Sequence, residues 1–356
     1  MKKVLVLILI MGLCVGFSQQ EVVEEEETIE LPASPDGSMF KGEEWYDLVE
    51  TVGINRELYH SHLLPYGSVE EALSNEQSAF TKSIDNASFV VNLTGEWDFY
   101  YADNPFERLG STWGVDWDTS DWDKIMVPSD ITLIKNEDGS FKYENPRYVN
   151  MEYPWTEDEN SIIQPYPVAP LNHNAVAHYQ RSFTLEETME GKEIFLRMEG
   201  ANSAYYLFVN GNRVGYSEDS YTAHEFNLTA YLNKDEEGNI ANQENKLQIM
   251  LYQYSLGSYL ENQDLISTFG IFRDVYLIGK DEVEIRDVAI TTNNSGTLNT
   301  TVNLRSLQLS ESKDYQLQVY VYKTDSNALV AKSQQERITL AAALAGEEKI
   351  YDAGVN

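Results

Sequence analysis

The sequence predicts an all-β protein made of a jelly-roll β-sandwich followed by a second, incomplete β-sandwich. Short β-rich runs alternate with turn residues over most of the 356 residues, and no long amphipathic helix interrupts them. Aromatic residues make up 12% of the chain, and 23 of them are tyrosine. Many short strands with few helices are typical of sandwiches, and amphipathic rings pack well between two sheets and at their rims.

The first element, residues 1–18, resembles a secretory signal peptide. Two lysines precede a run of apolar residues, and Gly16 and Ser18 supply the small side chains that favour cleavage after Ser18. A membrane anchor would need about 20 apolar residues, which is longer than this run. Lipid attachment at Cys14 is disfavoured by the bulky Leu13 before it. We therefore expect a secreted protein, periplasmic or extracellular, that is not anchored in a membrane.

Charge and cysteine content narrow the function further. The chain carries 58 acidic against 25 basic residues, so its surface repels phosphate backbones and anionic lipids, and we expect no nucleic-acid or membrane partner. Cys14 is the single cysteine and leaves with the signal peptide, so stability must come from buried apolar surface. The excess of acidic over basic residues fits a protein that acts on neutral substrates.

Residues 19–44 are predicted to be an acidic disordered tether, because a block of glutamates is followed by Pro and Gly. Residues 45–280 then form an arm, with a short helix over 69–73, and the jelly roll, with strands over 96–101, 179–185, 193–198, 204–209, 246–252 and 274–278. The Asn210-Gly211 dipeptide between two β-rich runs predicts a hairpin with a type I′ turn.

Residues 281–356 are predicted to be a truncated immunoglobulin-like sandwich. Alternating patterns give four strands, over 284–292, 298–307, 315–324 and 328–338, and an Ala-rich tail follows. An immunoglobulin-like sandwich needs about seven strands in roughly 100 residues, so we expect this domain to be cut short.

Several short motifs follow one another in a fixed order over roughly residues 45–340. In the sequence they read Gly53-Ile54-Asn55-Arg56, His60-Ser61-His62, Leu64-Pro65-Tyr66, Leu93-Thr94-Gly95-Glu96-Trp97-Asp98-Phe99, Ser120-Asp121-Trp122, Val127-Pro128-Ser129, Tyr148-Val149-Asn150-Met151-Glu152-Tyr153-Pro154, Gly200-Ala201-Asn202-Ser203-Ala204-Tyr205, Phe208-Val209-Asn210-Gly211, Val214-Gly215-Tyr216, Gly257-Ser258-Tyr259-Leu260-Glu261-Asn262-Gln263-Asp264 and Gly270-Ile271-Phe272-Arg273-Asp274-Val275. In this order the motifs resemble the N-terminal region of bacterial family-two β-galactosidases. By that resemblance they lie in the arm, the first jelly-roll strand and the segment after it, a sugar-facing loop, the central hairpin and a closing signature.

The resemblance implies a retaining glycosidase whose two reactive carboxyl groups lie in a later (β/α)₈ barrel. The sequence contains no Gly-Asn-Glu, the context of the family's acid/base, and no strand–helix alternation. We therefore expect no catalytic residue in this chain. Whether it takes part in catalysis depends on a barrel that another polypeptide supplies. The expected role is to supply substrate-pocket residues for hydrolysis of terminal β-galactosides.

Two substrate-binding residues follow from the resemblance. Asp264 matches an aspartate that binds a sodium ion and a sugar hydroxyl, as hard cations prefer oxygen ligands. Asn150 matches an asparagine that hydrogen-bonds the sugar, and an amide offers both donors and an acceptor. Met151 would line the pocket beside it. Sodium and magnesium are implied for the complete family enzyme, sodium only with further ligands from the barrel, and this chain alone is expected to hold no cofactor.

Other candidates favour structural roles. His60 and His62 lack further ligands for a zinc site. A sugar-stacking platform could include Trp97, Trp117, Trp122 and Trp155. Trp97 and Trp122 lie in core motifs, which favours packing for them, and Trp155 is the more open candidate. Two alternatives to the β-galactosidase portion stay open: a free-standing secreted carbohydrate-binding module, and a non-functional remnant. The expected partners are a β-galactoside or galactose-containing glycan and a separate barrel-containing chain.

Overall fold

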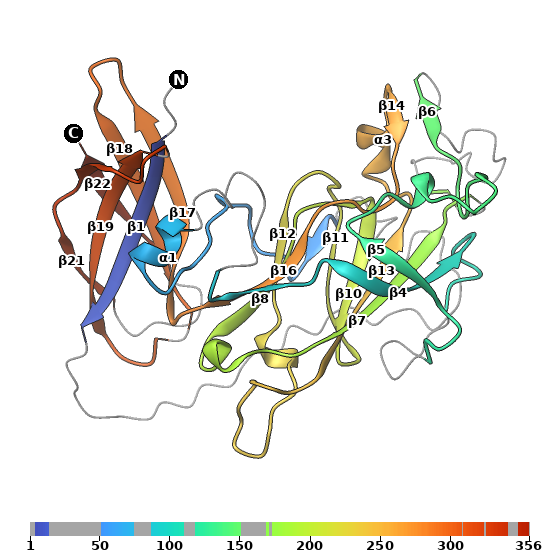
Figure 1. Cartoon of the computed structure of the whole chain (residues 1–356), viewed down its shortest axis with the longest axis horizontal. Helices are drawn as coiled ribbons and strands as arrows, with labels where there is room; N and C mark the ends of the chain where they lie inside the picture. The colour runs from blue at the N-terminus through green and yellow to red at the C-terminus, as the bar shows by residue number, and fades with distance from the viewer. Residues whose placement is uncertain are drawn as a thin grey trace.

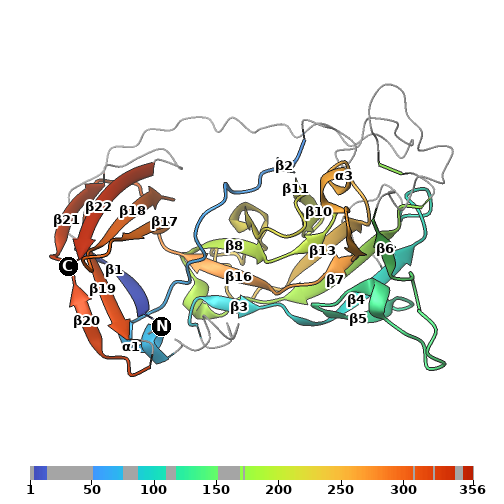
Figure 2. The same ribbon diagram turned by 90° about the horizontal axis from the view of Figure 1, so that it is seen from above.

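β-Strands make up most of the regular structure, as the sequence predicts. The computed structural model of the chain describes residues 4–13, 51–74, 87–109, 118–150, 169–170, 173–307, 309–323, 325–340 and 348–355. These residues form two β-sandwiches that lie next to each other along the long axis of the molecule, joined where β16 (Val275–Lys280) continues into β17 (Val283–Thr292) (Figures 1 and 2). The all-β prediction is confirmed.

The first sandwich contains a seven-stranded and a four-stranded sheet, both antiparallel. In spatial order the larger sheet consists of β2 (Gly53–Ile54), β11 (Asn212–Ser217), β10 (Ala204–Val209), β13 (Asn245–Tyr252), β7 (Val176–Phe183), β4 (Gly95–Ala102) and β5 (Asp123–Val127). The smaller sheet consists of β12 (His224–Asn227), β8 (Glu193–Met198), β16 (Val275–Lys280) and β3 (Val90–Asn92).

The core lies between these two sheets, and the alternation along β10 explains how the larger sheet is buried on both faces. Tyr205, Leu207 and Val209 belong to the main core, whereas Tyr206 and Phe208 belong to a second cluster. Successive side chains of a strand point to opposite faces, so every residue of β10 is buried. Such a strand reads as a continuous apolar run.

The predicted hairpin is confirmed. β10 and β11 pair antiparallel, with Val209 opposite Asn212. Asn210 and Gly211 have φ angles of 48° and 82°, and positive φ at both central residues is the requirement of a type I′ turn.

Several short helices, turns and two-stranded ladders lie around the rim of the first sandwich. They are the helices α1 (Val69–Ser74) and α3 (Ser258–Glu261), the 3₁₀ turns η2 (Ile131–Leu133), η3 (Glu187–Met189) and η4 (Thr229–Tyr231), and two ladders, β6 (Arg147–Val149) with β14 (Leu265–Ser267) and β9 (Ala201–Asn202) with β15 (Gly270–Ile271). α1 confirms the short helix predicted in the arm. In the described part of the chain, no helix is long and apolar enough to cross a membrane.

The second sandwich contains more strands than the sequence predicts. One sheet has β1 (Val4–Leu13), β19 (Lys313–Lys323), β20 (Leu329–Lys332) and β21 (Glu336–Leu340), and the other has β17 (Val283–Thr292), β18 (Leu298–Ser306) and β22 (Glu348–Val355). A cluster that includes Val302, Leu304 and Leu317 fills the space between them.

The strands of this region differ from the predicted ones. The strand predicted over 328–338 is two strands, because Ser333 exchanges hydrogen bonds with Val319 and interrupts the ladder between β20 and β21. The Ala-rich tail is followed by β22 rather than by irregular chain, so the count of four strands was wrong. Residues 4–13, inside the predicted signal peptide, pair with β19 over ten residues; signal-peptide cleavage stays a prediction, and the tether at 19–44 lies outside the described residues.

Candidate functional site

The structure brings the two predicted sugar-binding residues together at one end of the first sandwich. β6 and β14 form an antiparallel ladder in which Val149 is opposite Leu265. Asn150 and Asp264 each lie one residue beyond this pair, so the register places them opposite each other. Both residues are exposed. Two polar side chains from segments more than a hundred residues apart therefore share one exposed edge, named here the polar edge.

Tyr148 completes the polar edge. Its hydroxyl donates a 2.7 Å hydrogen bond to Oδ1 of Asp264, and this bond raises the pKa of Tyr148 because the carboxylate favours the protonated phenol. Tyr148 is 63% exposed, which places an exposed aromatic residue beside two hydrogen-bonding groups. Tyr148 was predicted only as part of the motif around Asn150, although its position two residues before Asn150 in a β-rich run was a usable signal.

The polar edge offers a cation part of a coordination shell. Oδ1 of Asp264 accepts from Tyr148, and no hydrogen bond reaches Oδ2 from the described residues, so one carboxylate oxygen is available. Sodium takes oxygen ligands, and Asp264 therefore fits as one ligand. Among the described residues, no three His, Cys, Asp or Glu side chains lie close enough together to hold a metal ion, whether sodium, magnesium or zinc.

A buried carboxyl group, Glu218, anchors the segment that leads to Asp264. Oε1 accepts a hydrogen bond from the Tyr216 hydroxyl at 2.5 Å, and Oε2 accepts from Ser255 Oγ and the Gly257 N–H at 3.2 and 3.1 Å. Burial raises the pKa of Glu218 to about 7, since the low-dielectric interior disfavours the charged form more than these hydrogen bonds favour it.

Glu261, the last residue of α3, provides a second anchor. Its carboxylate accepts hydrogen bonds from Ser220 N at 2.9 Å and from Ser220 Oγ at 2.5 Å. Burial raises the pKa of Glu261 as well. Together the two carboxyl groups fasten α3 to the loop between β11 and β12 and so fix where Asp264 emerges. Nothing local in the sequence distinguishes them from the many surface glutamates.

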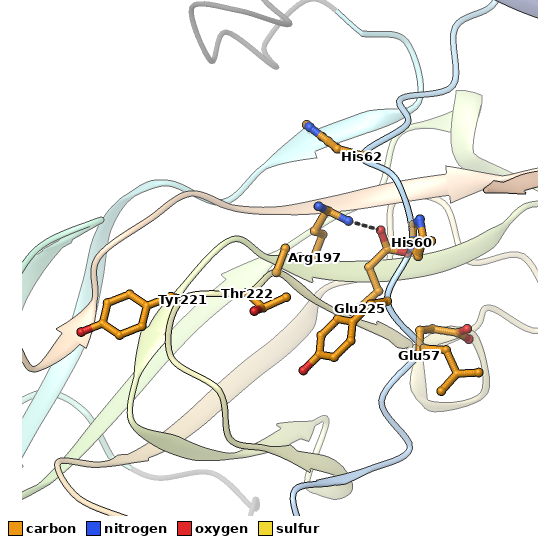
Figure 3. A pocket seen from close by; sticks show the side chains of 10 residues that line it. Glu57, His60, His62, Arg197, Tyr221, Thr222 and Glu225 are labelled. Carbon is orange, nitrogen blue, oxygen red and sulfur yellow. Dashed lines mark hydrogen bonds and ion pairs between the residues drawn. The ribbon is translucent and has the colours of Figure 1, made fainter. Parts of the chain in front are cut away.

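A second feature lies at the junction of the two sandwiches. Residues 53–62, named here the strap, begin at β2 and run past β12 toward β17. With β8 and β12 the strap lines a cavity of about 340 Å³, whose walls include Tyr59, His60, Arg197, Tyr221 and Glu225 (Figure 3). Figure 3 shows Arg197 and His60 on either side of the Glu225 carboxylate.

Charged side chains continue from this cavity into the second sandwich as an unbroken series of ion pairs. Glu225 contacts Arg197 at 2.7 Å, Lys280 at 2.8 Å and His60 at 3.2 Å. The series extends through contacts of Arg197 with Glu199, Lys280 with Glu284, Arg305 with Glu284 and Glu57, and Arg286 with Glu57. Burial opposes ionisation of Glu225, yet these cations hold its pKa well below the usual value. Its role is to join elements, not to transfer protons.

The remaining candidate residues either pack within the first sandwich or lie outside the described residues. Trp97 is 1% exposed and packs edge-on against Tyr179, which confirms its core role. Trp122 is partly exposed and lies against Tyr100. Trp117, Met151 and Trp155 lie outside the described residues, so the aromatic platform and the pocket lining stay predictions.

Comparison with known proteins gives this architecture a family. Residues 90–281 match the family described as "Glycosyl hydrolases family 2, sugar binding domain". The chain belongs to glycosyl hydrolase family 2. This family 2 chain is 32% identical over 302 residues to a β-galactosidase of Priestia megaterium and 33% identical over 301 residues to a β-galactosidase of Halalkalibacterium halodurans. These alignments cover 83% of the chain but 27% of either relative, so it spans about a quarter of their length.

Solved structures support the fold of this family 2 chain. A β-glucuronidase of Bacteroides uniformis superposes with a TM-score of 0.53 at 18% identity, over 75% of this chain and 27% of that one. At this level of identity the superposition indicates a shared fold and nothing about the substrate.

Proposed function

We propose that this chain is the non-catalytic, sugar-contacting N-terminal portion of a β-galactosidase-like retaining glycoside hydrolase. The observation that carries the proposal is the register of β6 and β14, which sets Asn150 opposite Asp264 beside the exposed ring of Tyr148. Three exposed residues with complementary chemistry for a sugar converge at one edge of the sandwich.

The chemistry assigns binding, not bond cleavage, to this edge. The Asn150 amide would donate to one sugar hydroxyl and accept from another. The Asp264 carboxylate would accept from a hydroxyl and, through its second oxygen, hold a sodium ion that orients the same group. The exposed face of Tyr148 would pack against the apolar face of the pyranose ring. None of these residues needs to change its protonation state.

Hydrolysis with retention requires two carboxyl groups about 5–5.5 Å apart, one as the acid and one as the nucleophile. The buried carboxyl groups beside the two features are already engaged: Glu218 and Glu261 hold α3, and Glu225 neutralises neighbouring cations. In the proposal the reactive pair of carboxyl groups comes from a barrel. The family relatives are about four times longer than the aligned region, which is long enough to include such a barrel. The proposed substrate is a terminal β-galactoside, which is hydrolysed after the chain has been exported.

Co-expression tests the proposal. The chain is produced together with the portion of the Priestia megaterium β-galactosidase that the alignment leaves uncovered, and nitrophenyl-galactoside hydrolysis is measured. We expect the chain to restore activity, and Asp264→Ala and Asn150→Ala to lower it by at least about tenfold, the cost of losing a hydrogen bond to substrate. The matched control is Glu311→Gln, an exposed acid of the second sandwich. A folded chain that restores nothing, or equal rescue by Asp264→Ala, would contradict the proposal.

A free-standing carbohydrate-binding module is the second candidate, and the exposed Tyr148 ring favours it. Calorimetry with galactose and lactose separates the two functions. A module should bind with a Kd near about 1 mM or better, whereas the proposed edge alone should bind more weakly because it lacks the walls that enclose a sugar.

A further inference from the structure

The ladder of β6 and β14 places a second pair of side chains next to the polar edge. Ile266 is directly opposite Tyr148 in the register, and directly opposite residues of two antiparallel strands share one face of the ladder. Ile266 is 60% exposed and Tyr148 is 63% exposed. The next residue of β14, Ser267, is buried, as the alternation of side chains along a strand requires. The ladder therefore has a buried face and an outer face, and Ile266 and Tyr148 lie on the outer face.

The Asp264 carboxylate lies on the same outer face. The φ angle of Asp264 is 55°, in the left-handed region that few residues other than glycine adopt. Its Oδ1 accepts the 2.7 Å hydrogen bond from the Tyr148 hydroxyl, so the carboxylate stays on the side of the Tyr148 ring. The polar row, Asn150 with Asp264, is thus followed by an apolar row, Tyr148 with Ile266, two residues or about 7 Å further along the strands.

The fold gives the apolar row no packing partner among the described residues. Neither Tyr148 nor Ile266 belongs to a hydrophobic cluster in that part of the chain. A single exposed isoleucine needs no explanation, since apolar atoms form much of any protein surface. An exposed apolar pair beside convergent polar groups is different, because ligand sites combine apolar surface with a few polar groups that orient the ligand. The apolar row therefore continues the proposed sugar contact and is not part of the core.

The spacing of the two rows suits consecutive parts of a glycoside. When the polar row holds the hydroxyls of galactose, the group linked to the sugar through the glycosidic oxygen, the aglycone, extends beyond the ring. The separation of about 7 Å between the rows is comparable with the length of a sugar unit. An aryl ring or a second pyranose can cover the Ile266 side chain and remove apolar surface from water, which is favourable. A methyl aglycone is too short to do so.

We propose that Ile266 is a specificity-determining residue that selects β-galactosides whose aglycone has an apolar face. The inference rests on the function proposed for the polar edge and deepens it by naming the class of substrate. The polar row binds the galactose and Ile266 binds only the aglycone, with the Tyr148 ring beside it. Galactosides with an aryl or pyranose aglycone are therefore preferred over galactosides with a methyl aglycone.

NMR of the full chain tests the contact without hydrolysis. The chain is labelled with carbon-13 in its isoleucine δ1 methyl groups and with nitrogen-15, and nitrophenyl β-galactoside and methyl β-galactoside are added separately. We expect both compounds to shift the Asn150 side-chain amide. The Ile266 methyl resonance should shift only with the nitrophenyl compound, because an aromatic ring close to a methyl group changes its local magnetic field. The matched control is Ile290, which is 46% exposed on β17 in the second sandwich and should not shift with either compound.

The co-expression assay provides the second measurement. Ile266→Thr keeps a β-branched side chain that suits a strand and removes apolar surface. We expect kcat/KM for nitrophenyl β-galactoside to fall by about five- to tenfold, near the lower limit for the loss of a small apolar contact. The value for methyl β-galactoside, measured as released galactose, should change by less than about twofold. The control Ile290→Thr should leave both values unchanged.

The possible outcomes separate the aglycone contact from the sugar contact. An Asn150 amide that shifts with both galactosides, beside an Ile266 methyl that does not respond to the nitrophenyl compound, overturns the inference and leaves the proposed function standing. If neither compound shifts the Asn150 amide, the proposed function fails and the inference fails with it. An equal fall of kcat/KM for both substrates in Ile266→Thr would show that the residue packs against the barrel, which also overturns the inference.

Discussion

The polar edge and the strap junction use polar side chains in opposite ways. At the polar edge, Asn150 and Asp264 are exposed and keep hydrogen-bonding capacity that no other described residue uses apart from the Tyr148 bond to Asp264. At the junction, Glu225 is 3% exposed and contacts Arg197, Lys280 and His60. Unused hydrogen-bonding capacity at a surface suits ligand binding, whereas buried ion pairs between elements suit assembly. The abundance of charge in this sequence therefore says little until burial and partners are known.

The largest effect is expected at the junction. Glu225→Gln would leave Arg197, Lys280 and His60 buried without their shared carboxylate, and we expect a loss of about 3–5 kcal/mol in the free energy of unfolding. Urea titration followed by circular dichroism measures this loss. The matched control at the polar edge, Asp264→Asn, should cost less than about 0.5 kcal/mol because the side chain is exposed. Similar losses for the two variants would break the contrast between the regions.

The next effect concerns pH and the anchor of α3. Because the pKa of Glu218 rises from 4.5 unfolded to about 7 folded, the folded state binds more protons between these values. Stability is therefore highest below pH 4.5 with respect to this group and falls as pH rises to about 7, by on the order of 3 kcal/mol. Urea titrations at a series of pH values should show this fall. In Glu218→Gln, whose amide stays neutral, this contribution should vanish; an unchanged slope would contradict the assignment.

A third prediction tests how closely the strap approaches β11. A Cβ at Gly215 would lie 2.5 Å from the Ile54 carbonyl oxygen and 2.8 Å from Phe226 Cε1. Gly215→Ala should displace β2 and cost about 1–3 kcal/mol, with faster hydrogen exchange in residues 53–57. The control Gly53→Ala meets the movable Arg56 side chain and should cost less. Equal protection of the strap in both variants would show that β2 is not held by this contact.

The smallest effect on stability is expected at Tyr148. Tyr148→Phe removes one hydrogen bond between exposed groups and should change the free energy of unfolding by less than about 0.5 kcal/mol. It should nevertheless free Oδ1 of Asp264 and change the response of that carboxylate to galactose and sodium. Carbon-13 NMR of the Asp264 carboxylate measures both. A large loss of stability would instead give Tyr148 a structural role.

Local signals were sufficient where a structure depends on adjacent residues. The Asn210-Gly211 turn and the continuous apolar run of β10 were predictable because turn geometry and side-chain hydrophobicity act within a few residues. Asn150 and Asp264 were predictable only through resemblance, since their proximity depends on a pairing between residues 149 and 265. β22 was missed because it follows an Ala-rich stretch, and β21 because the interruption at Ser333 depends on a hydrogen bond to Val319.

No local pattern in the sequence predicted the ion pairs at the junction of the two sandwiches. Glu57, Arg197, Glu225 and Lys280 look like ordinary charged residues at strand ends, and they meet because β8, β12 and β16 are neighbours in one sheet with the strap laid across it. Patterns of hydrophobicity place strands but not the partners of buried charges, which depend on long-range packing. His60 illustrates this: as part of a possible metal pair it was unremarkable, whereas its buried contact with Glu225 gives it a specific role.

The most direct test of the account is the response of the Asn150 side-chain amide to sugar. In the nitrogen-15-labelled chain, this resonance should shift on addition of millimolar or higher galactose, more in sodium than in potassium buffer, together with the amides of Tyr148 and Asp264. Glucose should cause smaller shifts, and Asp264→Ala should abolish the sodium dependence. Galactose-induced shifts that map to the strap cavity, or that leave the Asn150 amide unchanged at saturating sugar, would contradict the assignment of the polar edge as the sugar contact.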